Sequence, residues 1–273
     1  MSEAERIAIL AGEGDLPKLL ADVASKCLDV TVVSFGNPLE WASAYDEVVL
    51  PFEKPGMLFK ALKSRNISKV VFAGGMTRPN LDFKKFDFTM WTLAGLLLPA
   101  LKSGDDHTLR AILALFERRG FQVVSAQEIA PDLLVDKKMA SAQKLTVQDK
   151  RDIDRGIDIL KSLAAADVGQ GCVVSGGVCL GVETIQGTNA LLDFVAQHKR
   201  DKGGVFVKAP KTGQDKRVDM PTIGPETIKQ VAKAGLHGIA LIENGALVID
   251  KEKVTALAQK HGLFITVLHE GLL

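Results

Sequence analysis

The sequence predicts an α/β fold in two domains. Short β-branched runs alternate with segments of helical spacing in the first half, which is typical of a mostly parallel sheet covered on both faces. The second half adds a hairpin signal, Ser175-Gly176-Gly177, between two apolar runs. At 273 residues the chain is long enough for about two domains. Its 47% apolar and 25% charged residues fit a globular protein and exclude a disordered or collagen-like chain.

The first half supplies the elements of a parallel sheet. Its helices are predicted from apolar residues that recur on one face, as Leu16, Leu19, Leu20 and Val23 do. Gly120 stands where the last helix should stop. The predicted helices are Leu16–Lys26, Met57–Ser64 and Asp106–Arg119. The predicted strands are Arg6–Ala11, Val30–Phe35, Glu47–Leu50, Lys69–Ala73 and Phe121–Ser125.

Between Ala130 and Gln148 the periodic pattern gives way to polar residues, and we place a domain boundary there. The predicted domains are residues 1–135 and 136–273. The second is expected to be a mixed α/β domain with hairpins and with a long polar loop, Ala209–Gly224. Its predicted helices are Ile153–Leu163, Thr188–His198, Pro225–Ala234 and Lys251–Gln259. Its predicted strands are Gly171–Val174, Val178–Val182, Gly204–Lys208, Ile239–Ile242, Leu247–Ile249 and Leu263–Val267.

Charge and hydropathy narrow the classes of function. The net charge of +1 lacks the basic excess of a general nucleic-acid binder. The N-terminus is polar and unlike a signal peptide, and no apolar run approaches the ~20 residues that span a bilayer. We therefore expect a cytoplasmic protein whose membrane contact, if any, is peripheral. Cys27, Cys172 and Cys179 show no metal-ligand spacing and are expected to be buried in a reducing compartment.

Two glycine loops follow predicted strands of the first half. Gly12-Glu13-Gly14-Asp15 precedes a helix, where backbone N–H groups can meet a phosphate and Asp15 can cap the helix. A tight turn explains this loop equally well. A dinucleotide fingerprint would have glycine at Pro17 and an acid near Phe35, so NAD is disfavoured. Gly74-Gly75 leads to Arg78, which can pair with a phosphate or stay in solvent.

Two further segments of the first half have alternative interpretations. Asp105 and Asp106, followed by His107, can hold a divalent cation or cap the helix that they begin. Residues Phe83–Trp91 combine four aromatic residues with two lysines. That combination suits a lipid interface, but it also fits an ordinary amphipathic core segment.

The second half contains the richest chemistry. Residues Lys208–Asp219 gather cations, acids and a glutamine in one loop before a helix, and cations can neutralise phosphate while acids bind metal or activate water. Asp219, between Val218 and Met220, is expected to be a held carboxylate rather than a free one. Thr188 or Asn189 is predicted to cap the helix Thr188–His198, whose N-terminus can face an anion.

Taken together, these motifs resemble the LpxI family, the UDP-2,3-diacylglucosamine pyrophosphatases of lipid A biosynthesis. The segment Arg217–Gly224 is the most specific part of the resemblance, which covers nearly the whole chain. The other matching segments are Gly12–Pro17, Gly104–Asp106, Gly187–Ala190, Lys208–Gly224 and Ala234–Ile239.

The resemblance implies a Rossmann-like N-terminal domain, a family-specific C-terminal domain and an active site between them. It implies Mg²⁺-dependent hydrolysis of the substrate diphosphate to UMP and 2,3-diacylglucosamine 1-phosphate (lipid X). The family's essential aspartate matches Asp219. Asn189 stands where we expect an aspartate, which matters if that acid binds metal and not if it only caps a helix.

The expected site has one catalytic residue, Asp219, which orients water or binds Mg²⁺ together with Asp105 and Asp106. Lys208 and Arg217 are expected to neutralise the leaving phosphate. A non-catalytic nucleotide-sugar or lipid sensor and another nucleotide-dependent α/β enzyme remain alternatives. Contact with the inner membrane and assembly into a homo-oligomer are open. The residues expected to bind substrate are Gly12, Gly14, Asp15, Arg78, Thr188, Asn189, Lys208, Gln214, Arg217 and Thr222.

Overall fold

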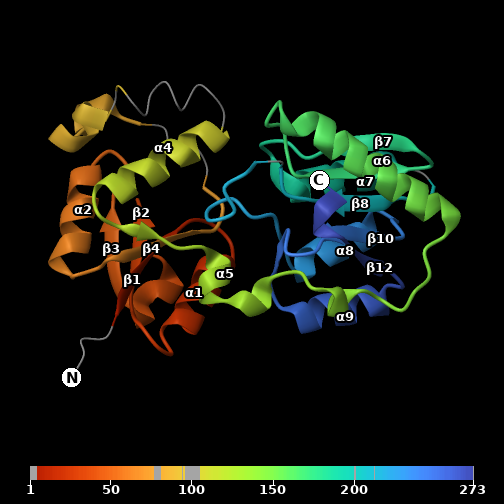
Figure 1. Ribbon diagram of the computed structural model, residues 1–273, viewed down its shortest axis with the longest axis horizontal. Coiled ribbons are helices and arrows are strands. Elements are labelled where there is room, and N and C mark those ends of the chain that lie inside the picture. The colour runs from red at the N-terminus through yellow and green to blue at the C-terminus, as the bar shows by residue number, and fades with distance from the viewer. Residues whose placement is uncertain are drawn as a thin grey trace. The chain divides into compact units, whose positions relative to one another are not determined.

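The computed structural model describes residues 5–76, 81–93, 95, 105–199, 201–211 and 213–272. The chain divides into two compact units. Unit 1 comprises Met1–Pro131 together with Asp215–Val218, and unit 2 comprises Asp132–Gln214 together with Asp219–Leu273. A short piece of the predicted polar loop therefore belongs to the first unit, although it lies more than eighty residues after the break between the units. Figure 1 colours the chain by residue number, so most of unit 1 is red to yellow and most of unit 2 is green to blue.

Unit 1 is built on a five-stranded sheet with the order β3-β2-β1-β4-β5. All its pairings are parallel, so the prediction of a parallel α/β sheet is confirmed. The strands are β1 (Arg6–Ala11), β2 (Asp29–Phe35), β3 (Asp46–Leu50), β4 (Lys69–Ala73) and β5 (Gln122–Val123). The α-helices whose bounds are described are α1 (Leu16–Ala24), α2 (Pro55–Ser64), α4 (Asp105–Arg118) and α5 (Ala126–Ile129).

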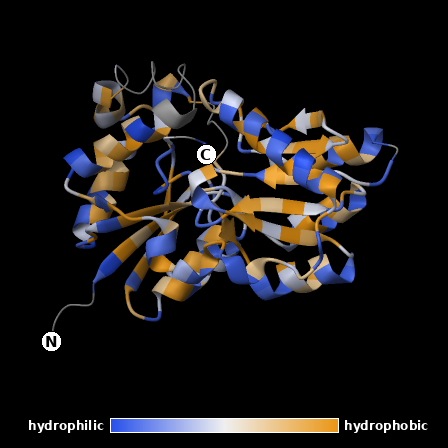
Figure 2. Ribbon diagram, turned by 45° about the vertical axis from the view of Figure 1, so that its right-hand side comes forward, coloured by the Kyte–Doolittle hydropathy of each residue, from blue (hydrophilic) through white to orange (hydrophobic). Residues whose placement is uncertain are grey.

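Alternating strand residues of unit 1 pack against different helices. Ala8 and Leu10 of β1 belong to a core cluster with Leu58 and Phe59 of α2 and Phe116 of α4. The other face of the sheet is covered by α1 and α5, which contact each other as well as the strands. Because both faces are covered, the central strands are mainly apolar in their interiors, as the orange stretches in Figure 2 show.

Unit 2 contains a mixed five-stranded sheet with the order β12-β10-β8-β6-β7. Strands β8, β10 and β12 are parallel, whereas β6 is antiparallel to both of its neighbours. The strands are β6 (Gly171–Ser175), β7 (Val178–Val182), β8 (Val205–Lys208), β10 (Gly238–Ile242) and β12 (Phe264–Leu268). The helices are α6 (Val147–Ala164), α7 (Gly187–His198), α8 (Pro225–Lys233) and α9 (Lys251–Lys260).

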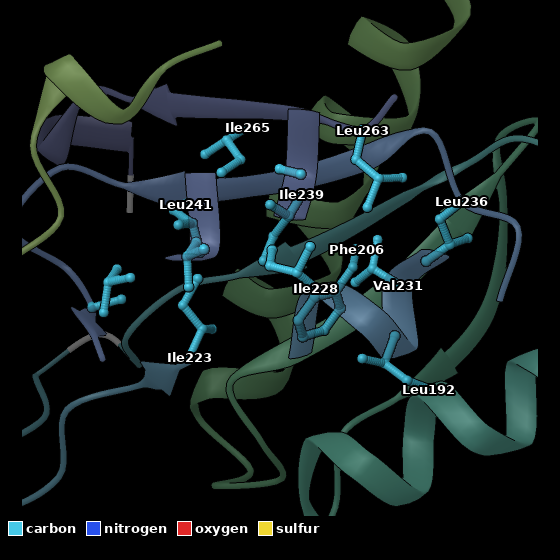
Figure 3. Packing of buried hydrophobic residues seen from close by; sticks show 14 of the residues in the cluster. Leu192, Phe206, Ile223, Ile228, Val231, Leu236, Ile239, Leu241, Leu263 and Ile265 are labelled. Atoms are coloured by element: carbon cyan, nitrogen blue, oxygen red, sulfur yellow. The ribbon is translucent and has the colours of Figure 1, made fainter. Parts of the chain in front are cut away.

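The two faces of this sheet carry separate cores. Helix α6 covers one face, and the close approach of its Gly156 to Val207 leaves no room for a Cβ, which would lie 2.5 Å from a valine methyl. Helices α7, α8 and α9 cover the other face. There Phe206 of β8 and Ile239 of β10 lie among residues such as Ile228 of α8, as Figure 3 shows. Burial of these side chains is the main favourable term that holds the sheet and helices together.

Several predicted elements need correction. Helix α6 begins at Val147, inside the segment predicted as a polar connection, because Thr146 and Asp149 form a capping box there. The long polar loop contains a short strand, β9 (Thr222–Ile223), which pairs in parallel with β11 (Leu247–Val248). Strand β11 therefore belongs to a separate two-stranded sheet and not to the five-stranded one. The remaining short helices are η1 (Glu40–Ala44), η2 (Phe83–Lys85), η3 (Pro131–Leu133), η4 (Lys137–Met139) and η5 (Glu270–Leu272).

The cysteine and helix-cap predictions are also corrected in part. Cys172 is buried as expected, but Cys27 and Cys179 are exposed. Helix α7 begins at Gly187 with Gln186 as its N-cap, so neither Thr188 nor Asn189 caps it. Both residues lie in the first turn instead, because the chain enters the helix earlier than the polar residues indicate.

Candidate functional site

The two glycine loops of unit 1 meet at the carboxyl ends of β1 and β4. The N–H of Glu13 donates to the carbonyl of Gly75 (2.6 Å), and the N–H of Gly75 donates back to Glu13 (3.0 Å). A Cβ on Gly12 would lie 2.2 Å from the Gly75 carbonyl oxygen, and one on Gly74 would lie 2.4 Å from that of Glu13. Glycine at these two positions is thus required by loop pairing, whether or not a ligand binds nearby.

The other expected binding residues of unit 1 are less constrained. Gly14 has a positive φ of 91° and open space around its Cα, and Asp15 is exposed. Asp15 stands at the N-cap of α1 as predicted, but its side chain makes no capping hydrogen bond. Arg78 lies outside the described residues. Asp105 and Asp106 begin α4, but their side chains are not among those described, so their expected metal role stays a prediction.

Unit 2 gathers polar groups at one edge of its sheet. Strands β7, β8, β10 and β12 run in the same direction, so their carboxyl ends share this edge. In open α/β sheets, ligands bind beyond the carboxyl ends of the strands. Lys208 is the last residue of β8, and Glu183 follows directly after β7. The loop from Ala209 to Gln214 continues from the same edge.

Lys208, Glu183 and Thr188 form a closed polar cluster at this edge. The Lys208 ammonium lies 3.0 Å from both carboxylate oxygens of Glu183 and also donates to the Thr188 hydroxyl. Thr188 in turn donates to Glu183 (2.7 Å). The side chains of Lys208 and Glu183 are only 5% and 12% exposed. A buried ammonium needs such partners, and the cluster therefore satisfies the charge of the cation predicted to bind phosphate.

Asp219 is held by two glutamine side chains from different segments. The amide groups of Gln170, which precedes β6, and Gln214 both donate to the same carboxylate oxygen, Oδ2, with 3.1 Å for Gln170. Gln214 also accepts the backbone N–H of Lys211 (2.9 Å) through its amide oxygen. Gln170 accepts the backbone N–H of Ala209 at its carbonyl (2.9 Å). The loop backbone and the carboxylate are thus fixed by the same residues.

A second ion pair lies beside Asp219. The Lys211 ammonium contacts the Asp167 carboxylate, and these side chains are 13% and 26% exposed. Burial raises the pKa of Asp219 above its ordinary value. The charge of Lys211 and the amides of Gln170 and Gln214 act in the opposite direction without cancelling this effect. A carboxylate with a raised pKa is a stronger base than an ordinary one, and this suits it to accept a proton from water.

The remaining expected residues make other contacts. Arg217 belongs to unit 1, where its guanidinium contacts Asp215 (2.7 Å) and Glu117 (2.6 Å). These hydrogen bonds, chiefly that with Asp215, raise the pKa of Arg217 further. Thr222 lies on β9, where its hydroxyl donates to the Met220 carbonyl (3.1 Å). Asn189 is exposed on the first turn of α7. Unit 2 by itself therefore brings together Asp219, Gln214, Lys208 and Thr188.

The chain matches known proteins along nearly its whole length. Residues 6–133 match the LpxI N-terminal domain, and residues 136–266 match the LpxI C-terminal domain. The chain belongs to the LpxI family. It is 34% identical over 271 residues to the UDP-2,3-diacylglucosamine pyrophosphatase LpxI of Caulobacter vibrioides, an alignment that covers 95% of this chain and 96% of that protein. The resemblance inferred from the motifs is confirmed.

Three residues of this edge were not predicted. Glu183 partners Lys208, Gln170 holds Asp219, and Asp167 holds Lys211. The sequence gives little signal for them, because each lies at the end of a helix or strand far from the predicted loop along the chain. Glu183 has the clearest one, because it is a charged residue directly after an apolar strand end.

The described residues contain no group of three or more histidine, cysteine or acidic side chains arranged to hold a metal ion. Mg²⁺ commonly keeps several waters and binds proteins through one or two carboxylates plus substrate phosphates. The donor set around Asp219 fits that mode, and does not fit a site made of protein ligands alone. Within the same described residues, no helix has the length and apolarity needed to cross a bilayer.

Proposed function

We propose that this chain hydrolyses the diphosphate of UDP-2,3-diacylglucosamine to UMP and 2,3-diacylglucosamine 1-phosphate, a step of lipid A biosynthesis. The match to both LpxI domains along the chain carries this proposal. The activity printed in the name of the Caulobacter relative, a pyrophosphatase, is a hydrolysis of this kind. A polar edge with a held carboxylate and two lysines provides groups that such a reaction uses.

In the proposed reaction Asp219 acts on water. Its raised pKa favours removal of a proton from a water molecule that attacks the diphosphate. Gln170 and Gln214 fix the carboxylate, so little reorientation is needed when the substrate binds. The charge of Lys211 acts to lower the pKa of this carboxylate, and we expect Lys211 to bind a phosphate oxygen of the substrate. Lys208 stabilises the edge through Glu183 and Thr188.

We further propose Mg²⁺ as a cofactor. Asp219 would hold the ion through one of the waters that Mg²⁺ commonly keeps, together with diphosphate oxygens, and the carboxylate would then stay able to accept a proton. When bound, Mg²⁺ would neutralise negative charge on the diphosphate. The Mg²⁺ proposal is separate from the proposed reaction. Turnover without added metal would overturn the Mg²⁺ proposal and leave the proposed reaction intact.

The decisive experiment is UMP release from UDP-2,3-diacylglucosamine by the purified chain, with Mg²⁺ and with excess chelator. We expect release with Mg²⁺ and its loss with chelator. Asp219→Asn should lower turnover about 10²- to 10⁴-fold while the protein stays folded. The matched control is Asp154→Asn on the exposed surface of α6, which should keep normal turnover. Full activity of Asp219→Asn would remove Asp219 from the mechanism.

The same assay separates the alternative functions. A folded protein that binds the substrate but releases no UMP under either condition would be a sensor of nucleotide sugars or lipids. Binding of a nicotinamide dinucleotide would favour another nucleotide-dependent enzyme instead.

We propose that the chain contacts a membrane through residues 83–91 of unit 1, a surface that suits a lipid-linked substrate. Phe83, Phe88 and Trp91 are 54%, 84% and 57% exposed, and Lys84 and Lys85 lie among them. Exposed aromatic side chains with lysines favour the interface of an anionic bilayer. Phe88→Ser should reduce sedimentation with phosphatidylglycerol vesicles, whereas Val147→Ser, at an exposed valine of unit 2, should not. Equal binding by both variants would contradict the proposal.

We also propose that the chain forms a homo-oligomer through β7. This strand lies at the edge of the unit 2 sheet and contains no charged residue. Its Val178 is 61% exposed, and an uncharged edge strand readily pairs with another strand. Light scattering should show a multiple of the 29.3 kDa chain mass that Val178→Lys reduces to the monomer. A monomeric wild-type chain would overturn this proposal.

A further inference from the structure

Asp167 occupies a position that local rules assign to glycine. It follows the end of α6 with a φ of 52°, in the left-handed region that glycine adopts most readily and that few other residues enter, asparagine and aspartate foremost. Its carboxylate also stands at the C-terminal end of that helix, where the helix dipole disfavours negative charge. The backbone N–H of Asp167 donates to the Ala164 carbonyl (3.1 Å), a bond that glycine would make equally well. Neither the turn nor the helix explains why an aspartate stands at this position in place of glycine.

The contacts of the side chain point to a different reason. The Asp167 carboxylate pairs with the Lys211 ammonium, and both side chains are largely buried. The backbone N–H of Lys211 is bound by Gln214, whose amide group donates to Asp219. Asp167 is thus connected to Asp219 through a lysine and a glutamine, all within unit 2. Strained backbone that persists beside a candidate site favours a functional explanation for the residue that adopts it.

We propose that Asp167 is a positioning residue, which holds the Lys211 ammonium beside Asp219 so that Lys211 binds the diphosphate of the substrate. The inference rests on the proposed function. An ammonium has three N–H donors, so an ion pair with Asp167 leaves donors that can reach a phosphate oxygen. Without Asp167, the long lysine side chain would have to be ordered by the substrate itself, at a cost in binding.

A mutant cycle tests whether Asp167 acts through Lys211. The variants are Asp167→Gly, Lys211→Ala and the double variant, and the measured quantities are kcat and KM for UMP release. Asp167→Gly should raise KM about tenfold, with a smaller change in kcat, because the Lys211 ammonium is no longer held in position to bind the diphosphate. The double variant should be no worse than Lys211→Ala alone. Asp167→Asn should retain most of the activity, because asparagine tolerates the left-handed conformation and can still accept a hydrogen bond from Lys211.

Stability separates positioning from a structural role. Asp167→Asn should unfold at close to the wild-type temperature, because asparagine keeps the left-handed backbone and a hydrogen bond to Lys211. Asp167→Gly should unfold at a lower temperature and still be folded under assay conditions, because the buried Lys211 ammonium loses its carboxylate. The matched control is Asn66→Gly in unit 1, which has the same conformation (φ 55°) after α2. This control should keep or gain stability, and it should keep wild-type kcat and KM.

Two results would overturn the inference. One is an unchanged KM in Asp167→Gly. The other is an equal loss of kcat/KM from Asp167→Gly with Lys211 present and with Lys211 replaced. Calorimetric binding of UDP-2,3-diacylglucosamine in the Asp219→Asn background gives a readout without turnover, and unchanged affinity on adding Asp167→Gly there would also refute it. Failure of the proposed function has another signature, namely no UMP release and no substrate binding by the wild type, which would overturn both.

Discussion

Replacing Lys208 by methionine should strongly destabilise unit 2. The ammonium lies 3.0 Å from both oxygens of Glu183, and the two side chains are 5% and 12% exposed. Methionine fills a similar volume but leaves the Glu183 carboxylate buried without its cation. Breaking a buried pair in this way costs about 3–5 kcal/mol. The double variant Lys208→Met with Glu183→Gln removes both charges and keeps an acceptor for Thr188, so it should recover to within about 1 kcal/mol of the wild type.

The assay is urea unfolding monitored by hydrogen-exchange mass spectrometry. Peptides from β8 and α6 report the stability of unit 2 separately from that of unit 1. The matched control is Lys233→Met, which breaks an exposed pair with Asp193 (66% and 42% exposed). That variant should keep nearly the wild-type urea midpoint, because solvent screens an exposed pair. A loss below about 1 kcal/mol for Lys208→Met, or a double variant as unstable as the single one, would refute the reasoning. Lys208 would then be a substrate-facing cation rather than half of a structural pair.

Three further predictions concern other parts of the chain. Gly12→Ala should separate the two glycine loops of unit 1 and destabilise it by about 1–3 kcal/mol in urea unfolding, because its Cβ would lie 2.2 Å from a carbonyl oxygen. Burial opposes ionisation of Asp149, but hydrogen bonds from Thr146 and His237 outweigh it and leave the pKa of Asp149 lowered. This carboxylate therefore contributes stability above its unfolded pKa of about 3.9, and Asp149→Asn should flatten the loss of stability on acidification below that value. Burial raises the pKa of the Cys172 thiol to about 12, so iodoacetamide should modify the two exposed cysteines of the native chain well before Cys172, as peptide mass spectrometry will show.

Much of the fold follows from the sequence because burial imposes periodicity. The central strands of unit 1 are buried on both faces, so they appear as apolar runs such as Ile7–Ala11. Boundaries set by single side chains were harder to predict. Helix α6 begins at the capping box of Thr146 and Asp149, which stands in a polar stretch that resembles a linker. Strand β9 has two residues and exists because it pairs with β11, which follows it by more than twenty residues.

The residues of the candidate site also divide into those that the sequence could predict and those that it could not. Asp219 and Gln214 could be predicted because they share a loop whose polar composition is unusual between apolar elements. Their partners could not, because Gln170 and Asp167 come from the connection between α6 and β6, more than forty residues earlier. Such contacts depend on how strands are ordered in the sheet. Local spacing carries no information about that order.

The pairing of the glycine loops bears on the alternative of a dinucleotide-dependent enzyme. In a dinucleotide-binding sheet, the pyrophosphate enters the crevice between the loops that follow the strands at the switch point. In unit 1 the corresponding loops, after β1 and β4, are joined by two backbone hydrogen bonds between Glu13 and Gly75. A pyrophosphate that entered the crevice there would have to break both bonds, at about 0.5–1.5 kcal/mol each. Pro17 also removes one of the backbone donors that a helix N-terminus would offer. We therefore expect NADH fluorescence to be unchanged by the protein, and saturable binding would refute this interpretation of the loops.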